Sequence, residues 1–242
     1  MKVRSVGLCL ALILNGLSGG VSLALAEEMT LPGEFSATVN ITSDYVYRGV
    51  SQTNEDIAVQ SSLDWNHESG LYLGMWATNV DFGDGTELEM DIYGGFASEV
   101  AGISYDVMVL GYLYPGARAG DQDFIEFSLG LGYDAGFASA NVGLAVSPEW
   151  YGNSGVGTYI YGGVAVPIPI GALEGTGVAF SIDANFGYQD LADASNFVHY
   201  DVGLGIELLG FALDVRYVGN DIDDGSLKVD DDRVVFGISR EF

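Results

Sequence analysis

Residues 178–188 read VAFSIDANFGY, and this stretch decides the fold. Large apolar side chains such as Phe180 and Ile182 alternate with small or polar ones such as Asp183. Residues 198–208, VHYDVGLGIEL, repeat the alternation. Successive side chains of a β-strand point to opposite faces, so an alternating stretch predicts a strand with one apolar and one polar face.

The same alternation recurs along the chain. We expect twelve strands, at 35–47, 58–67, 71–80, 87–96, 103–114, 123–133, 137–147, 156–166, 177–188, 197–208, 211–218 and 233–242. Most hold about ten residues, the length with which a tilted strand crosses a bilayer. Tight connections such as 68–70 and 209–210 alternate with longer polar ones, and only the proline-containing link after 166 breaks this rule. The sequence therefore predicts an all-β fold, a transmembrane up-and-down antiparallel β-barrel of about 12 strands.

The N-terminus has the features of a secretory signal peptide. A basic start and an apolar run precede Ala24-Leu25-Ala26, which has the small-x-small pattern of a cleavage site. We expect residues 1–26 to be cleaved and residues 27–242 to form a single barrel domain. The only cysteine, Cys9, lies in the signal, so the mature chain would have neither disulfides nor thiolate metal sites. An exported barrel of this kind predicts location in the bacterial outer membrane.

The composition excludes several classes of protein. With 34 acidic and 8 basic residues, the chain has a formal net charge of −26. Such a charge repels a phosphate backbone, so we expect no nucleic-acid partner. Hydrophobic residues make up 48% of the chain, and a disordered chain lacks that apolar content.

Charged residues within the strands share one face. Ten acids have the parity that we assign to the lumen: Asp44, Asp64, Glu89, Asp91, Asp106, Glu126, Asp183, Asp201, Glu207 and Asp214. Arg216 and Arg233 accompany them. A cationic side chain facing lipid at the bilayer midplane costs about 2–4 kcal/mol, and acids cost somewhat less, so the charges identify the inner face. We expect these twelve residues to line the lumen and to favour cations.

The leading functional hypothesis is a porin that passes small cationic or neutral solutes through this acidic lumen. A barrel of about 8 strands is filled by its side chains and one of about 16–18 encloses a channel, so 12 strands lie between. The alternative is a plugged structural or binding barrel without conductance. An outer-membrane hydrolase is a third hypothesis, because Ser181 and His199 share the inner face with Asp183 and Asp201. We favour a protein that is not an enzyme, with no catalytic residues and no cofactor.

Two loops carry further charge. The connection 219–232 is crowded with aspartates, and we interpret it as a solvated acidic loop that divalent ions bridge to lipopolysaccharide. A calcium site is the alternative, but Gly225 stands where an EF-hand places its third acidic ligand, so we predict no metal site. In the first long loop, we expect Arg48 to pair with acids around it.

Aromatic residues gather near the strand ends, as in the two girdles of an outer-membrane barrel that contact lipids and lipopolysaccharide. The long-loop girdle would hold Tyr45, Tyr47, Tyr112, Tyr114, Tyr188, Tyr200 and Tyr217. The short-turn girdle would hold Trp65, Phe96, Tyr133, Phe211 and Phe242. A terminal Phe242 that closes an alternating strand looks like the signal recognised by the barrel-assembly machinery, which we therefore expect as a partner.

One further pattern is shared with a known family. Residues 43–53 read SDYVYRGVSQT, and LDWNHESGLY (63–72), GMWATNVDF (74–82) and EMDIYGG (89–95) follow. This succession resembles the TorF family of proteobacterial porins, whose function is otherwise unknown. The resemblance is strongest over about the first third of the mature chain. It implies an outer-membrane barrel, and it supplies no substrate and no catalytic residue.

Deletion of Phe242 is expected to lower the yield of folded barrel, because the closing strand loses its terminal aromatic side chain. Heat-modifiable mobility on gels of outer-membrane fractions measures that yield. Normal insertion of the truncated chain would show that Phe242 is not the assembly signal.

Overall fold

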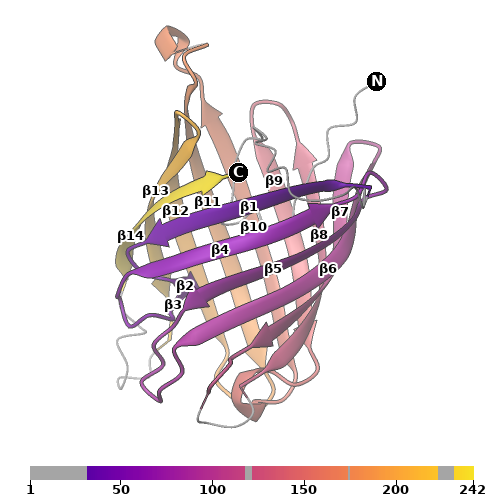
Figure 1. Cartoon of the computed structure of the whole chain (residues 1–242), viewed down its shortest axis with the longest axis vertical. Helices are drawn as coiled ribbons and strands as arrows, with labels where there is room; N and C mark the ends of the chain where they lie inside the picture. The colour runs from indigo at the N-terminus through magenta and orange to yellow at the C-terminus, as the bar shows by residue number, and fades with distance from the viewer. Residues whose placement is uncertain (1–31, 118–121, 174, 223–231) are drawn as a thin grey trace, which may run out of the picture.

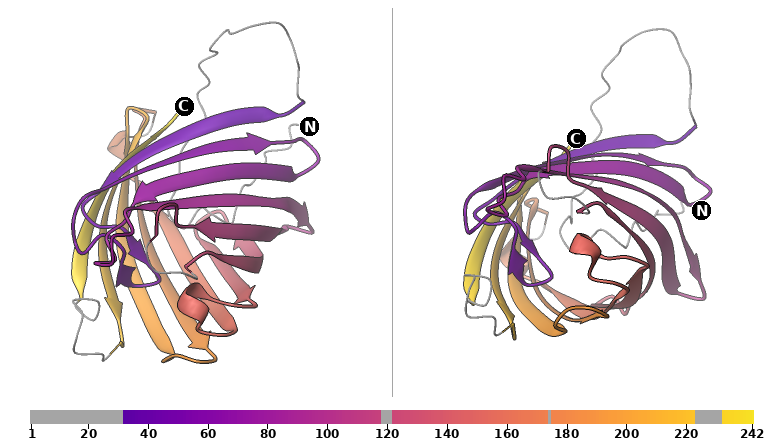
Figure 2. Two further views of the ribbon diagram at one scale, coloured as in Figure 1. Left: turned by 60° about the horizontal axis from the view of Figure 1, so that its bottom comes forward. Right: turned by 90° about the horizontal axis from the view of Figure 1, so that it is seen from below.

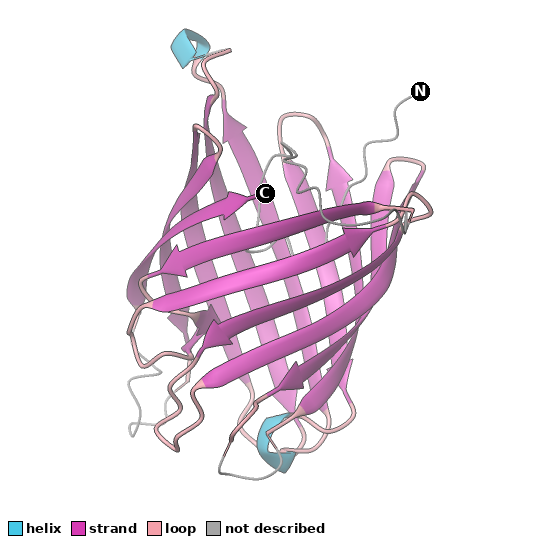
Figure 3. Cartoon of the chain, viewed as in Figure 1, coloured by secondary structure: helices cyan, strands magenta, loops and turns pink. Residues whose placement is uncertain are grey.

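The computed structural model describes residues 32–117, 122–173, 175–222 and 232–242. The predicted signal peptide, residues 1–26, lies outside the described residues, as does most of the acidic connection 219–232. Two short 3₁₀ segments, η1 (Tyr151–Asn153) and η2 (Gly171–Leu173), are the only helical elements in the described part of the chain (Figure 3). Within the described ranges, no helix is long and apolar enough to span a bilayer.

Twelve antiparallel strands close into one barrel, which confirms the predicted fold class (Figure 1). They are β1 (Glu34–Thr42), β4 (Ala58–Asn66), β5 (Leu71–Asn79), β6 (Leu88–Val100), β7 (Ile103–Leu113), β8 (Phe124–Asp134), β9 (Ser139–Ser147), β10 (Gly157–Ile168), β11 (Val178–Leu191), β12 (Phe197–Leu208), β13 (Phe211–Asn220) and β14 (Arg233–Glu241). Each strand pairs with its sequence neighbours, and β1 pairs with β14 from Thr38↔Glu241 to Thr42↔Gly237.

The two faces of the sheet differ as the alternation predicts. On β11, the side chain of Ile182 is 47% exposed on the outer face, whereas Gln189 is fully buried on the inner face. On β8, Ile125, Phe127 and Leu129 are likewise exposed, with the buried Glu126 between them. An apolar outer face on a closed barrel is the arrangement that a lipid bilayer requires, so the fold is that of a transmembrane barrel.

The connections differ in length at the two ends of the barrel. Tight turns such as Ala101–Gly102 and Leu209–Gly210 lie at the end of the barrel where β1 begins and β14 ends (Figure 1). All four of these residues have positive φ angles, between 54° and 82°, as a two-residue type I′ hairpin requires. The link between β10 and β11 is the exception expected from its prolines, and it carries η2. The longer loops lie at the opposite end.

The first strand is shorter than predicted, and this is the main correction to the expected fold. Strand β1 ends at Thr42, and a small hairpin follows, formed by β2 (Val46–Tyr47) and β3 (Val50–Ser51). Arg48 and Gly49 form its turn, with φ angles of 48° and 83°. Seen from the long-loop end, this hairpin and η1 project into the ring of strands (Figure 2). The first loop is therefore part of the barrel interior.

The inward hairpin also corrects the predicted long-loop girdle. Tyr45 is buried inside the barrel, and Tyr112 and Tyr114 are buried at the end of β7. Tyr47 is only partly buried, and it packs on the same interior cluster. These four rings fill the space between the wall and the inward loops. Tyr188, Tyr200 and Tyr217 are exposed.

Substitution of Ile182 by Arg should damage the barrel far more than substitution of Ser181 by Arg. Ile182 faces outward near mid-strand, where Arg costs about 2–4 kcal/mol, whereas Ser181 faces the interior and its acids. Urea unfolding of the two variants in lipid vesicles measures the difference. Equal tolerance would mean that the faces of β11 are assigned wrongly.

Candidate functional site

The candidate site is the interior of the barrel, where the charged residues of the strands meet. All the predicted lumen acids except Asp44 lie on strands, from β4 to β13. Asp44 lies beyond the end of β1, in the segment that turns inward. Glu207 lies on β12 opposite Ala212, at the end of the barrel that carries the short turns. The other acids, except Asp91, fall into groups that are each held by specific partners.

The largest group surrounds Arg216 on β13. Its Nη1 donates to Asp183 Oδ2 at 2.7 Å and also to Asp201, and its Nη2 donates to Asp214 Oδ2 at 3.2 Å. Asn185 Nδ2 donates to both Asp183 and Asp201, at 3.0 and 2.8 Å. Three carboxylates share one guanidinium, so this cluster keeps an excess of negative charge.

A glycine makes room for the Arg216 cluster. Gly203 pairs with Arg216 across β12 and β13. A Cβ atom at position 203 would lie 2.5 Å from Arg216 Nη2 and 2.8 Å from Asp183 Oδ1. The guanidinium therefore lies flat across a residue without a side chain, and this brings it within reach of two neighbouring strands.

The second group surrounds Arg48, at the tip of the inward hairpin. Arg48 Nη2 donates to both carboxylate oxygens of Glu126 on β8, at 2.8 and 2.7 Å, and Nη1 donates to Gln189 on β11. Its Cζ lies 3.9 Å from the ring centroid of Tyr159 and 4.7 Å from that of Tyr47. The Arg48 and Glu126 side chains are only 7% and 6% exposed. The partner of Arg48 thus lies across the barrel and not in its own loop.

A third contact ties the same inward segment to the last strand. Arg233, at the start of β14, donates to Asp44 Oδ2 at 3.2 Å. The other oxygen of Asp44 accepts hydrogen bonds from the hydroxyls of Ser51 and Thr53, at 2.6 and 2.9 Å. Asp44 therefore organises the turn that takes the chain inward.

Tyrosines hold three further acids. Tyr45 donates to Glu89 at 2.8 Å, and Tyr72 donates to Asp106 at 2.9 Å. Tyr93 donates to Asp64, which also accepts from Ser62 at 2.8 Å. Together with the groups around Arg216, Arg48 and Arg233, these bonds hold eight of the ten expected acids in place, all but Asp91 and Glu207.

Aromatic rings fill much of the long-loop half of the interior. The rings of Tyr112 and Phe124 stack with centroids 4.1 Å apart, and Tyr47 meets Tyr112 edge-on at 5.8 Å. Trp150 and Tyr151, at η1, pack on the same cluster. This half of the barrel is therefore narrowed by packed side chains.

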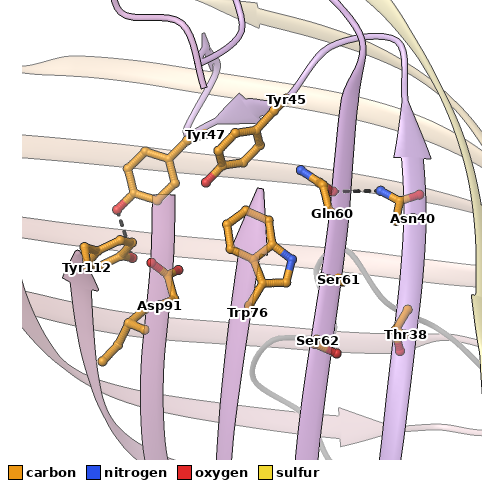
Figure 4. A pocket seen from close by; sticks show the side chains of 11 residues that line it. Thr38, Asn40, Tyr45, Tyr47, Gln60, Ser61, Ser62, Trp76, Asp91 and Tyr112 are labelled. Atoms are coloured by element: carbon orange, nitrogen blue, oxygen red, sulfur yellow. Dashed lines mark hydrogen bonds between the residues drawn. The ribbon is translucent and has the colours of Figure 1, made fainter. Parts of the chain in front are cut away.

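A pocket of about 130 Å³ remains beside this aromatic cluster, between the wall and the inward segment (Figure 4). It is lined by Thr38, Asn40, Tyr45, Tyr47, Gln60, Ser61, Ser62, Trp76, Asp91, Leu110 and Tyr112. Asp91 is the one acid of the lining. Sequence reasoning missed the pocket because it forms only when Tyr45 and Tyr47 turn inward.

The structure does not assemble the alternative hydrolase site. His199 pairs with Gly187 on β11, six residues from Ser181. At about 3.3 Å per residue, Ser181 and His199 lie about 20 Å apart along the sheet, far beyond hydrogen-bond contact. The partner of His199 Nε2 is the Tyr159 hydroxyl, at 2.7 Å. His199 is thus a packed residue of the interior wall.

The acidic connection 219–232 is described only at its ends. Asp221 Oδ1 accepts from the Val198 backbone at 2.6 Å, and Asp232 accepts from the hydroxyls of Tyr200 and Tyr217. Asp221 thus bonds to β12, and Asp232 bonds to both β12 and β13. Among the described residues, no group of three or more His, Cys, Asp or Glu is arranged to hold a metal ion.

Comparison with known proteins places the chain in a family and its fold among porins. The family described as "Bacterial protein of unknown function (Gcw_chp)" matches residues 26–242. No curated protein matches the sequence. The description of this family does not include the TorF name that the N-terminal motifs suggested, and that name is not confirmed.

Solved structures share the fold at low sequence identity. The chain is similar to the KdgM porin, with a TM-score of 0.57 and 10% identity over 86% of this chain and 99% of that one. It is similar to the KdgM porin in complex with disordered oligogalacturonate, with a TM-score of 0.55 and 9% identity over 86% and 98% of the two chains. This likeness is one of fold.

Substitution of Arg48 by Met is expected to destabilise the barrel by about 3–5 kcal/mol, because it leaves Glu126 buried without its partner. The double variant Arg48→Met/Glu126→Leu should recover most of that loss, since it removes both charges. Urea unfolding in lipid vesicles gives the free energies. A single-variant loss below about 1 kcal/mol would mean that the pair behaves as an exposed one.

Proposed function

We propose that this chain, which belongs to the Gcw_chp family of bacterial proteins of unknown function, is an outer-membrane porin for small cationic or neutral solutes. The observation that carries the proposal is a closed transmembrane barrel whose interior holds ten strand and turn acids against three arginines. Carboxylates within low-dielectric walls concentrate cations and repel anions.

The partners follow from the two faces of the barrel. The apolar outer face would contact outer-membrane lipids, and the long loops would contact lipopolysaccharide. Phe242, at the end of the closing strand, would be the signal for the barrel-assembly machinery. The signal peptide would deliver the chain across the inner membrane. Ser181 and His199 lie apart, so the described interior does not favour the hydrolase that these two residues suggested.

One observation favours the alternative of a plugged barrel without conductance. The inward hairpin and η1 pack aromatic rings across the long-loop half of the interior. If this packing seals the lumen, the well-folded protein would not conduct. Conductance therefore separates the two functions.

The charges of the Arg216 cluster suggest the variant for a selectivity test. Substitution of both Asp183 and Asp201 would leave Arg216 with one carboxylate, so a change in folding could obscure a change in selectivity. Asp214 is the most exposed of the three carboxylates. Its substitution by Asn removes one lumen charge and leaves Arg216 paired with two aspartates.

We expect a cation-selective channel in planar bilayers, measured by the reversal potential under a potassium chloride gradient. Selectivity should weaken between about 0.1 and 1 M salt, since the Debye length falls from about 10 to about 3 Å. Asp214→Asn should reduce cation preference, whereas Glu68→Gln, which removes a charge from an exposed turn, should not. Anion selectivity would refute the proposal, and absence of conductance from folded protein would favour the plugged barrel.

A further inference from the structure

The pocket beside the aromatic cluster has walls of two kinds. One wall is the inner face of β1, β4, β5, β6 and β7, and the other is the inward segment that carries Tyr45 and Tyr47 (Figure 4). Because the two walls come from different parts of the chain, the pocket has a defined shape only when the hairpin is in place. Arg48 and Asp44 hold it there.

Four aromatic rings line this pocket. Trp76 meets Tyr45 edge-on, with ring centroids 5.3 Å apart, and Tyr47 meets Tyr112 at 5.8 Å. Figure 4 shows these rings grouped around the Asp91 carboxylate. The faces of aromatic rings carry negative potential, so a group of rings attracts a cation.

Six polar side chains of the lining already have hydrogen-bond partners. Asn40 Nδ2 donates to Gln60 Oε1 at 2.7 Å, and the Tyr47 and Tyr112 hydroxyls share a hydrogen bond of 3.1 Å. Tyr45 and Ser62 donate to acids next to the pocket, Glu89 and Asp64. These bonds satisfy part of the hydrogen-bonding capacity of the lining.

Asp91 differs from the rest of the lining. Its side chain lies on β6 and the residue is 8% exposed, yet Oδ1 has no hydrogen-bond partner among the described residues. A buried carboxylate oxygen without a partner carries a large free-energy cost. No Lys, Arg or His belongs to the described lining, so the compensating positive charge is not supplied by the pocket itself.

We propose that this pocket binds a small organic ammonium cation, with the charge on Asp91 and the substituents against Trp76, Tyr45, Tyr47 and Tyr112. Asp91 supplies the counter-charge, and the rings supply both cation–π attraction and apolar contact. An anion would meet a carboxylate and no cation. A neutral sugar would bring no positive charge to the Asp91 carboxylate. Binding at this site does not depend on the proposed porin function. Its role does, since in a porin the site would bind ammonium solutes as they pass through the channel.

The test uses the full chain, isolated from outer membranes in detergent, with choline as the probe in isothermal titration calorimetry. Choline should bind saturably, and its uncharged carbon isostere dimethylbutanol should bind at least about tenfold more weakly, since only choline pairs with the carboxylate. This comparison needs no variant, so a folding defect cannot obscure it. Equal binding of the two compounds, or no saturable binding of choline, would overturn the proposal.

Variants locate the site within the barrel. Asp91→Asn should weaken choline binding by about tenfold or more, and Trp76→Leu by about two- to thirtyfold. Glu68→Gln removes an acid from an exposed turn outside the pocket, so it should leave choline binding unchanged. Choline binding that Asp91→Asn and Trp76→Leu do not affect would overturn the assignment to this pocket.

Bilayer recordings on the same preparations separate this site from the porin. Channels that conduct but show no choline binding by calorimetry would overturn the site and leave the porin standing. Choline binding by a barrel that does not conduct would support the site and refute the porin. If both hold, choline should also reduce the potassium current reversibly in the wild-type channel, and it should do so less in Asp91→Asn.

Discussion

The structure depends on the pairing of the first strand with the last. In the hydrocarbon core of a bilayer each unpaired backbone N–H or C=O costs several kcal/mol, so a sheet that faces lipid must have no edge. The β1–β14 pairing removes the edges of the twelve-stranded sheet. Closure then divides every strand into a lipid face and an interior face. Charged side chains in the middle of the strands have only the interior to occupy, and their pairing with one another follows from that confinement. Arg240, which is exposed, lies near the end of β14.

The strands and their faces could be predicted from the sequence because lipid imposes a strict period of two. Asp183 stands between Ile182 and Ala184, and only one assignment of faces keeps its carboxylate out of lipid. The inward turn after Thr42 could not be predicted in this way, because the alternation continues through Tyr45 and Tyr47 beyond the end of β1.

Side-chain contacts hold the chain in its inward position, and the alternation of apolar and polar residues does not reveal them. Asp44 accepts bonds from Ser51 and Thr53, and Arg48 reaches Glu126, a residue of a distant strand. The local signal, visible in retrospect, is the pair Arg48–Gly49, which forms a two-residue turn between the short strands β2 and β3. The same contacts decide the charge of the interior. Arg48 and Glu126 neutralise each other and three aspartates surround Arg216, so the negative charge is uneven and not a uniform ring.

The sequence separation of the Arg48 contacts has a consequence for the timing of assembly. Glu126 and Gln189 follow Arg48 by 78 and 141 positions, on β8 and β11. The hairpin cannot dock in the interior until β8 and β11 have joined the sheet, because these strands carry the partners of Arg48. The interior of a newly formed barrel would thus be wide at first and would narrow when the hairpin docks. That docking would be a step separate from membrane insertion.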